Sequence, residues 1–184
     1  GLPGRHNVET AVAACALAML AGAEEDEVRE AMKTFKGNRR RFDYEIEEKD
    51  VVLIDDYAHH PEEIRTMLTS VREMYDGRKI TVVFQPHLYT RTRDFADGFA
   101  KSLSLADRVL LLDIYPAREL PIEGVTSQLL ADKMKNKDVS LTNKETLLND
   151  LLGSQFDVIV MMGAGNIDAL VPVVEKRIRE IKSL

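Results

Sequence analysis

The sequence predicts an α/β fold, a doubly wound and mostly parallel β-sheet that follows two helices. Short, continuously apolar runs such as "VVLI", "ITVVF", "RVLLL" and "VIVMM" alternate with amphipathic segments at helical spacing. Strands that are apolar on both faces are typical of a parallel sheet covered by helices on both sides. With 184 residues and 45% apolar content, the chain can bury one substantial core.

Two helices are expected before the sheet. The first, residues 7–21, is apolar nearly all round, so we expect it to be buried on most sides. Gly22 ends it, and an amphipathic helix follows over residues 24–35. Gly37 and Asn38 then break the helical pattern. The sequence therefore predicts a helical segment over residues 1–36 and an α/β domain over residues 37–184.

The α/β domain is expected to begin with a β-hairpin over residues 43–57. After it, helices and strands are expected to alternate. The helices are predicted over residues 61–75, 93–105, 126–134, 144–152 and 167–181, and the strands over residues 79–86, 107–115, 139–142 and 157–163.

Charge and cysteine content exclude several function classes. The formal net charge is −6 and the basic cluster Arg39–Arg41 is local, so no nucleic-acid partner is expected. The single cysteine, Cys15, excludes an internal disulfide framework and is typical of the reducing cytoplasm. Its Ala-rich, apolar surroundings favour a small core residue over a nucleophile.

The apolar run over residues 11–23 has a second interpretation, because its ending "AGA" resembles a signal-peptidase site. The run is too short to span a bilayer as a helix, and Glu9 stands just before it. A buried helix is the favoured interpretation, and no membrane partner is expected.

Polar or glycine-rich segments follow the four main apolar strands. They are "DDYAHHP", "QPHLYTRTR", "DIYPARE" and "GAGN", whereas the opposite strand ends carry ordinary turns such as "YDGRK". In an open parallel sheet, ligands bind beyond the carboxyl ends of the strands. The asymmetry predicts a functional site at that edge.

The first of these segments has simpler interpretations. Asp55 or Asp56 could merely cap the helix that follows. His59 and His60 could bind a metal ion, but adjacent residues rarely aim at one ion, and no HExxH or CxxC partner is present. No metal site is therefore expected.

The other segments also leave alternatives open. "GAGN" could cradle a phosphate, although a tight strand-to-helix turn is favoured. Arg91 and Arg93 suit carboxylates and phosphates, or could form surface salt bridges. The chain contains no GxxxxGK[ST] phosphate loop and no GxSxG elbow.

Six segments in a fixed order carry a family resemblance: "PGRHNVETAVAA", "GNRRRF", "DDYAHHPEEI", "FQPHLYTRTRDF", "DIYPARELPIEG" and "GAGNI". Together they resemble the C-terminal part of the Mur ligases, most closely the members that add L-alanine to UDP-N-acetylmuramate. The resemblance covers essentially the whole chain. It implies that residues 1–36 are the tail of a central ATPase domain and that residues 37–184 form a Rossmann-like C-terminal domain.

The resemblance also implies an ATP-dependent reaction in peptidoglycan precursor synthesis. ATP activates the carboxylate of UDP-N-acetylmuramate as an acyl phosphate, the amine of L-alanine attacks, and phosphate leaves. ATP and Mg²⁺ are the expected cofactors, with Mg²⁺ held mainly by the central domain. The expected protein partners are the N-terminal and central domains of the same protein, without which the fragment is expected to be inactive.

Nucleotide-binding roles carry over by resemblance to four residues. His6 and Asn7 match a family pair near the adenine. Arg41 is expected to reach the ATP phosphates and to stabilise the transferring group. Asp56 matches the acid that meets the ribose hydroxyls.

Substrate-binding roles carry over to four further residues. Tyr57 and His59 would face the reacting centre and the alanine, with Arg41 and His59 as the catalytic candidates. His87 and Arg91 would hold the amino acid, and Arg91 is the candidate for its carboxylate. Thr10 and Leu88 depart from the family pattern, which has Asn and Arg there, so one adenine contact and one cation are absent.

Two other functions stay open. One is a sister ligase that recycles murein tripeptide onto UDP-N-acetylmuramate, although its loop lacks the His-x-x-x-Arg arrangement of "HLYTR". The other is a stand-alone doubly wound module that binds a nucleotide or an acidic metabolite.

Overall fold

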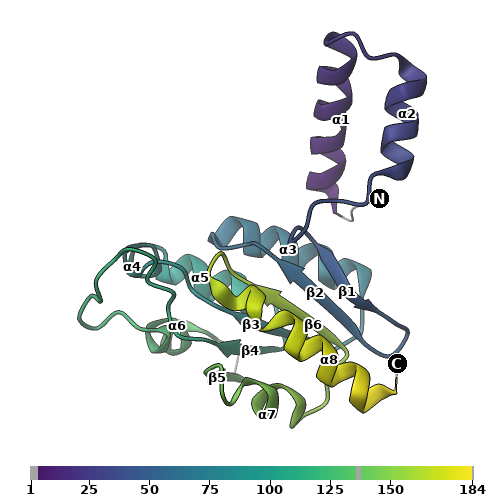
Figure 1. Cartoon of the computed structure of the whole chain (residues 1–184). Coiled ribbons are helices and arrows are strands. Elements are labelled where there is room, and N and C mark those ends of the chain that lie inside the picture. Colours follow the sequence, from purple (N-terminus) through teal and green to yellow (C-terminus); the bar gives the residue numbers. More distant parts are fainter. Residues whose placement is uncertain (1–3, 136–137, 184) are drawn as a thin grey trace.

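A six-stranded sheet forms the α/β part of the chain, in the order β1-β2-β6-β3-β4-β5 (Figure 1). The computed structural model describes residues 4–135 and 138–183, except for the side chains of Arg5 and His6. β1 runs antiparallel to β2, and the other neighbouring pairs are parallel. The predicted fold class is confirmed. The strands are β1 (Asp43–Glu47), β2 (Val52–Asp56), β3 (Ile80–Phe84), β4 (Arg108–Leu111), β5 (Val139–Leu141) and β6 (Val158–Met162).

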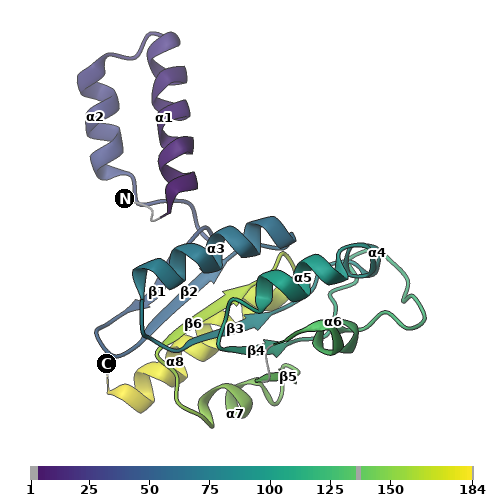
Figure 2. The same ribbon diagram turned by 180° about the vertical axis from the view of Figure 1, so that it is seen from behind.

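Helices cover both faces of this sheet (Figures 1 and 2). One core packs α3, α5 and α6 against the sheet, and a second core packs α7 and α8 against the other face. Along β2, Val52 and Ile54 belong to the first core and Leu53 to the second, as the apolar run predicted. The helices are α1 (Arg5–Leu20), α2 (Glu25–Thr34), α3 (Pro61–Met74), α4 (Tyr89–Asp94), α5 (Ala96–Leu103), α6 (Ser127–Lys133), α7 (Leu147–Leu152), η1 (Asn166–Ala169) and α8 (Val171–Lys182).

The carboxyl ends of the central strands are level with one another. In the sheet register, Asp56 and Phe84 both pair with Met162, and Phe84 also pairs with Leu111. The segments that leave β2, β6, β3 and β4 therefore start from one edge. This alignment brings together residues that are more than 100 positions apart in the sequence.

Helices α1 and α2 form a hairpin that projects away from the α/β domain (Figures 1 and 2). The prediction that α1 is buried on most sides is wrong, because α1 packs mainly against α2. Val12 remains 65% exposed and Leu17 67% exposed. In the described ranges, no helix combines the length and the apolar character needed to cross a membrane.

The helix predicted over residues 93–105 is wrong in its bounds, because it is two helices. The chain leaves helical geometry at Phe95, between α4 and α5. α4 starts early because Leu88 turns the chain with a φ of 72°, and Glu119 accepts a hydrogen bond from the Thr90 amide at 2.9 Å. The other predicted helices and strands are present, with ends shifted by a few residues.

Candidate functional site

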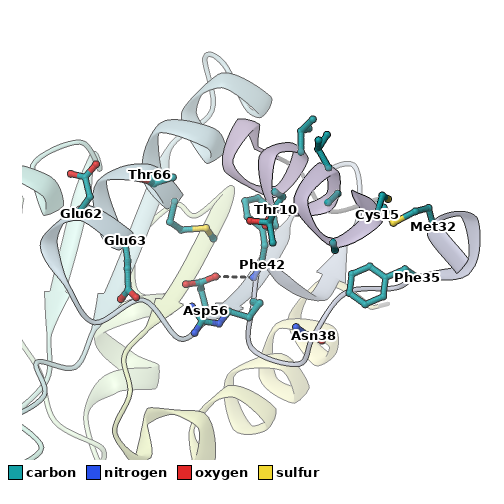
Figure 3. A pocket seen from close by; sticks show the side chains of 17 residues that line it. Thr10, Cys15, Met32, Phe35, Asn38, Phe42, Asp56, Glu62, Glu63 and Thr66 are labelled. Atoms are coloured by element: carbon teal, nitrogen blue, oxygen red, sulfur yellow. Dashed lines mark hydrogen bonds between the residues drawn. The ribbon is translucent and has the colours of Figure 1, made fainter. Parts of the chain in front are cut away.

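A cleft of about 1220 Å³ lies between the helical hairpin and the α/β domain (Figure 3). One wall is largely apolar, and Cys15, which was expected in the core, is half-buried in this wall. Asn7, Arg41 and Asp56 are among its polar lining residues. The side chain of His6 lies outside the part of the chain that the structure describes. The apolar lining residues are Val8, Ala11, Val12, Ala14, Cys15, Met32, Phe35, Phe42 and Met67.

Asp56 lies at the end of β2 with its carboxylate held by the main chain. Its Oδ2 accepts a hydrogen bond from the Phe42 amide at 2.8 Å (Figure 3). Its Oδ1 accepts one from the Ala58 amide at 2.8 Å. Burial raises the pKa of this carboxyl, while these two amides and Arg41 oppose the rise. Each carboxylate oxygen can accept a second hydrogen bond, so the group can still meet a ligand hydroxyl.

Asp55 points to a different environment. Its Oδ2 accepts a hydrogen bond from Arg40 Nε at 3.2 Å, while its buried Oδ1 has no partner within the described residues. Burial raises the pKa of Asp55 to about 6, although Arg40 opposes this rise and Glu45 adds to it. Neither Asp55 nor Asp56 caps α3, because His60 occupies the N-cap position. The capping interpretation of the two acids is therefore wrong.

Tyr57 lies between the cleft and the rest of the site. Its amide donates to the Arg40 carbonyl at 2.8 Å, and the guanidinium groups of Arg40 and Arg41 lie 5.1 and 5.4 Å from its ring centroid. The Arg40 side chain is only 15% exposed, because Nη2 donates to the Gly163 carbonyl at 2.6 Å. Arg40 thus fixes Tyr57, whereas the exposed Arg41 side chain lines the cleft.

An aromatic row continues from Tyr57 along the sheet edge. The Tyr57 and His59 ring centroids are 5.1 Å apart, those of His59 and His87 are 6.1 Å apart, and those of His87 and Tyr115 are 5.7 Å apart. His59 Nδ1 is 2.9 Å from the Tyr57 carbonyl oxygen, so it carries the proton and donates. Three separate loops supply this row, as expected for strands that point the same way.

Arg91 lies near His87 in this row, close enough for its charge to act on the imidazole. Burial lowers the pKa of His87, and the nearby Arg91 and His59 lower it further while Glu119 opposes them, so the site favours the neutral imidazole. His87 Nδ1 and Arg91 Nη1 are buried and have no hydrogen-bond partner within the described residues. Arg93, by contrast, forms the surface salt bridge foreseen as an alternative, with Asp94 at 2.7 Å.

The two adjacent histidines point to different neighbours. His59 packs against Tyr57 and His87, whereas the His60 ring packs against Phe95 with centroids 4.8 Å apart. Among the described residues, no three His, Cys, Asp or Glu side chains are grouped so that they could hold a metal ion.

The "GAGN" segment is a tightly packed turn. A Cβ atom at Gly163 would lie 2.8 Å from the Gln85 carbonyl oxygen, and one at Gly165 would lie 2.4 Å from Gln85 Oε1. Only a 3₁₀ turn of four residues, η1, follows directly. The glycines therefore allow close packing against the loop after β3, which supports the turn and not the phosphate cradle.

Residues 40–165 match the sequence profile of the Mur ligase glutamate ligase domain. The chain belongs to the Mur ligase family. It is 52% identical over 180 residues to the UDP-N-acetylmuramate–L-alanine ligase of Flavobacterium johnsoniae, a match that covers 98% of this chain and 40% of that relative.

Solved structures of Mur ligases share the fold. The alanine ligase MurC of Thermotoga maritima superposes with a TM-score of 0.79 at 31% identity, covering 97% of this chain and 39% of that one. A murein peptide ligase from Psychrobacter arcticus superposes with a TM-score of 0.69 at 21% identity, covering 96% and 37% of the two chains. At that identity the second likeness concerns the fold alone.

Two residues at the site of this Mur ligase chain were not among the residues predicted from the sequence. Arg40 was seen only as part of a basic cluster, yet it fixes Tyr57 and pairs with Asp55. Tyr115 stacks on His87 at an interplanar angle of 18°. Tyr115 follows β4 within the segment "DIYPARE", so the rule that the strand ends converge could have placed it at the site.

The two departures from the Mur ligase pattern lie in different parts of the site. Thr10 lines the cleft beside Asn7. Leu88 precedes α4 with its positive φ, and its amide donates to the Tyr115 carbonyl at 2.9 Å.

Proposed function

We propose that this chain is the C-terminal part of an ATP-dependent ligase that joins L-alanine to UDP-N-acetylmuramate through an acyl phosphate. The observation that carries the proposal is the meeting of a nucleotide-sized cleft with an imidazole and guanidinium row at one sheet edge. The identity of 52% with a ligase of that name supports the choice of reaction.

Nucleotide binding is assigned to the cleft. Its volume, about 1220 Å³, exceeds the range of roughly 300–1,000 Å³ that is usual for small-molecule sites, so it has room for ATP. The apolar wall suits the adenine, and Asn7 lines the cleft beside it. His6 keeps the adenine role that the family resemblance implies. Asp56 has acceptor capacity left for the ribose hydroxyls, and Arg41 provides a cation for the phosphates.

Amino-acid binding is assigned to the aromatic row. An alanine carboxylate would give Arg91 the anionic partner that it lacks among the described residues. The lowered pKa of His87 favours its neutral form, which adds no repulsion to the incoming ammonium group. Tyr57 and His59 lie between this end and the cleft, where the amine must approach the acyl carbon.

The reaction needs neutralisation of the negative charge on the phosphoryl group more than it needs covalent catalysis by the protein. The muramate carboxylate takes the terminal phosphoryl group of ATP, ADP leaves, and the alanine amine then displaces phosphate from the acyl carbon. Arg41 stabilises the negative charge on the transferring group, and His59 is the candidate that contacts the reacting centre. Mg²⁺ supplies further charge neutralisation, and we assign no ligand for it to this chain.

The remaining parts of the proposal concern the whole protein. The chain spans 40% of the length of its Flavobacterium relative, and we infer that the sugar site and the GxxxxGK[ST] loop lie in other domains. Residues 1–36 are assigned to the central ATPase domain and residues 37–184 to the C-terminal domain. A cytoplasmic location is supported by the single cysteine.

Phosphate release by the full-length protein tests this function. With ATP, Mg²⁺ and UDP-N-acetylmuramate present, L-alanine is expected to start phosphate release, and murein tripeptide is expected not to. Turnover with the tripeptide and none with L-alanine would assign the protein to the recycling reaction instead.

A further inference from the structure

The turn after β6 packs directly beneath the amino-acid end of the site. A Cβ atom at Gly165 would lie 2.7 Å from Tyr115 Cβ and 2.8 Å from Tyr115 Cγ, in addition to its contact with Gln85. The φ of Gly165 is −84°, which other residues adopt readily. The position excludes a side chain because of these neighbours.

Tyr115 cannot move aside freely, because its main chain is tied to the His87 loop. Its amide donates to the Pro86 carbonyl at 2.8 Å, and its carbonyl accepts from the Leu88 amide at 2.9 Å. His87 and Tyr115 also form a parallel bridge. A displacement of the Tyr115 ring therefore has to act on the stacked His87 ring, whose centroid is 5.7 Å away.

Gln85 holds the turn against Tyr115 from the other side. It is only 4% exposed, and its Nε2 donates to Asn166 Oδ1 at 3.0 Å. The main-chain amide of Gln85 also donates to the Met162 carbonyl at 3.0 Å, and this bond joins the loop after β3 to the end of β6. Gln85 and Tyr115 thus enclose Gly165 from two sides and leave no room for a side chain.

We propose that Gly165 and Tyr115 are positioning residues for His87. The missing side chain at residue 165 lets the Tyr115 ring lie flat against the imidazole, which fixes the orientation of His87. The role of the oriented imidazole in L-alanine binding rests on the proposed function. The orientation of His87 is independent of that function.

The orientation of His87 can be measured by proton NMR on the 184-residue chain. The stacked Tyr115 ring shields the His87 ring protons, whose signals are assigned by their loss in His87→Gln. Gly165→Ala and Tyr115→Leu are both expected to move these signals downfield. The conservative Tyr115→Phe keeps the aromatic ring and is expected to leave the signals where they are in the unsubstituted chain. Unmoved His87 signals in Tyr115→Leu overturn the proposal, even if Gly165→Ala fails to fold.

A matched control is available at the opposite end of the sheet. A Cβ atom at Gly153, which has a φ of −71°, would lie 2.7 Å from the Asn149 carbonyl oxygen. Gly153→Ala is expected to lower stability without moving the His87 signals. Equal shifts in Gly153→Ala and Gly165→Ala would mean general loosening and overturn the positioning role.

Kinetics of the full-length enzyme give the second measurement. Gly165→Ala is expected to raise the KM for L-alanine about tenfold, because small displacements of binding groups are costly, and to leave the KM for ATP nearly unchanged. An equal rise in both KM values contradicts the inference. Absence of alanine-dependent turnover in the unsubstituted enzyme overturns the proposed function instead, and the NMR measurement then decides the positioning role.

Discussion

Asp55 is a buried acid whose charge is only partly compensated. Arg40 pairs with Oδ2, but Oδ1 has no partner within the described residues, and Glu45 adds repulsion. An acid that is buried in this way favours its protonated form in the folded chain. The same Arg40 guanidinium reaches Gly163 and lies over Tyr57, so the ionisation of Asp55 acts on a contact that shapes the site.

The pKa of Asp55 predicts a change of stability with pH. The folded pKa is about 6, against 3.8 for an ordinary Asp, so the folded chain binds the proton more tightly than the unfolded chain. This contribution to stability is fully present below about pH 4 and is lost as the pH rises through 6, by at most ~3 kcal/mol. Urea unfolding of the chain and of Asp55→Asn between pH 4 and 7 measures it. The same pH slope in both proteins would contradict the assignment.

Helix α3 begins at the end of the "DDYAHHP" segment, directly after His60. Glu63 closes its N-terminus, where Oε2 accepts from the His59 amide at 3.0 Å and from the His60 amide at 3.1 Å. Pro61 in the first helical turn needs no amide partner there. One carboxylate thus both starts the helix and fixes the main chain of the His59 loop.

Replacing that carboxylate is expected to weaken the helix start. Glu63→Ala leaves two amides without their acceptor, so the free energy of unfolding is expected to fall by about 1 kcal/mol. Glu62→Ala is the control, because Glu62 is exposed and its side chain forms a surface ion pair with Arg65, a kind of interaction that contributes little to stability. Urea denaturation compares the two, and equal losses would remove the capping role of Glu63.

Strands and helices were predictable from the sequence where the local pattern of apolar residues alone determines them. The strands were found because β2, β3 and β6 are buried along their whole length and read as unbroken apolar runs. The early start of α4 was not found, because it depends on Glu119, through a contact distant in the sequence, and on the unusual φ of Leu88. Local periodicity carries neither piece of information.

The site was predictable to the extent that sheet topology determines it. Parallel strands bring His59, His87 and Arg91 to one edge, as the sequence analysis expected. The roles of Arg40 and Tyr115 depend on three-dimensional packing and could not be read from the residue pattern. Burial of α1 was wrongly predicted because composition does not say what covers a helix.

On the scale of the whole molecule, the cleft lies between the helical hairpin and the α/β domain, which we propose belong to different domains of the full-length protein. The hairpin contributes its apolar wall and the α/β domain contributes Arg41 and Asp56. The chain contains no GxxxxGK[ST] loop to hold the ATP phosphates. A nucleotide bound here would therefore lack much of its phosphate binding.

The isolated chain is accordingly expected to show no alanine-dependent ATP hydrolysis. Titration calorimetry of ATP and of L-alanine into the chain and into the full-length protein is expected to show clearly tighter ATP binding by the full-length protein. Alanine-dependent hydrolysis by the chain alone contradicts this division of labour between domains.

We propose that the loops at this sheet edge form one binding site, in which Arg91 holds the amino-acid carboxylate. The most direct measurement is the KM for L-alanine of the full-length enzyme carrying Arg91→Ala, with Arg93→Ala as the control, since Arg93 pairs with Asp94 at the surface. Arg91→Ala is expected to raise this KM by about 10- to 150-fold, which corresponds to the loss of ~1.5–3 kcal/mol for a charged hydrogen bond, while Arg93→Ala leaves it unchanged. An unchanged KM in Arg91→Ala would contradict the account.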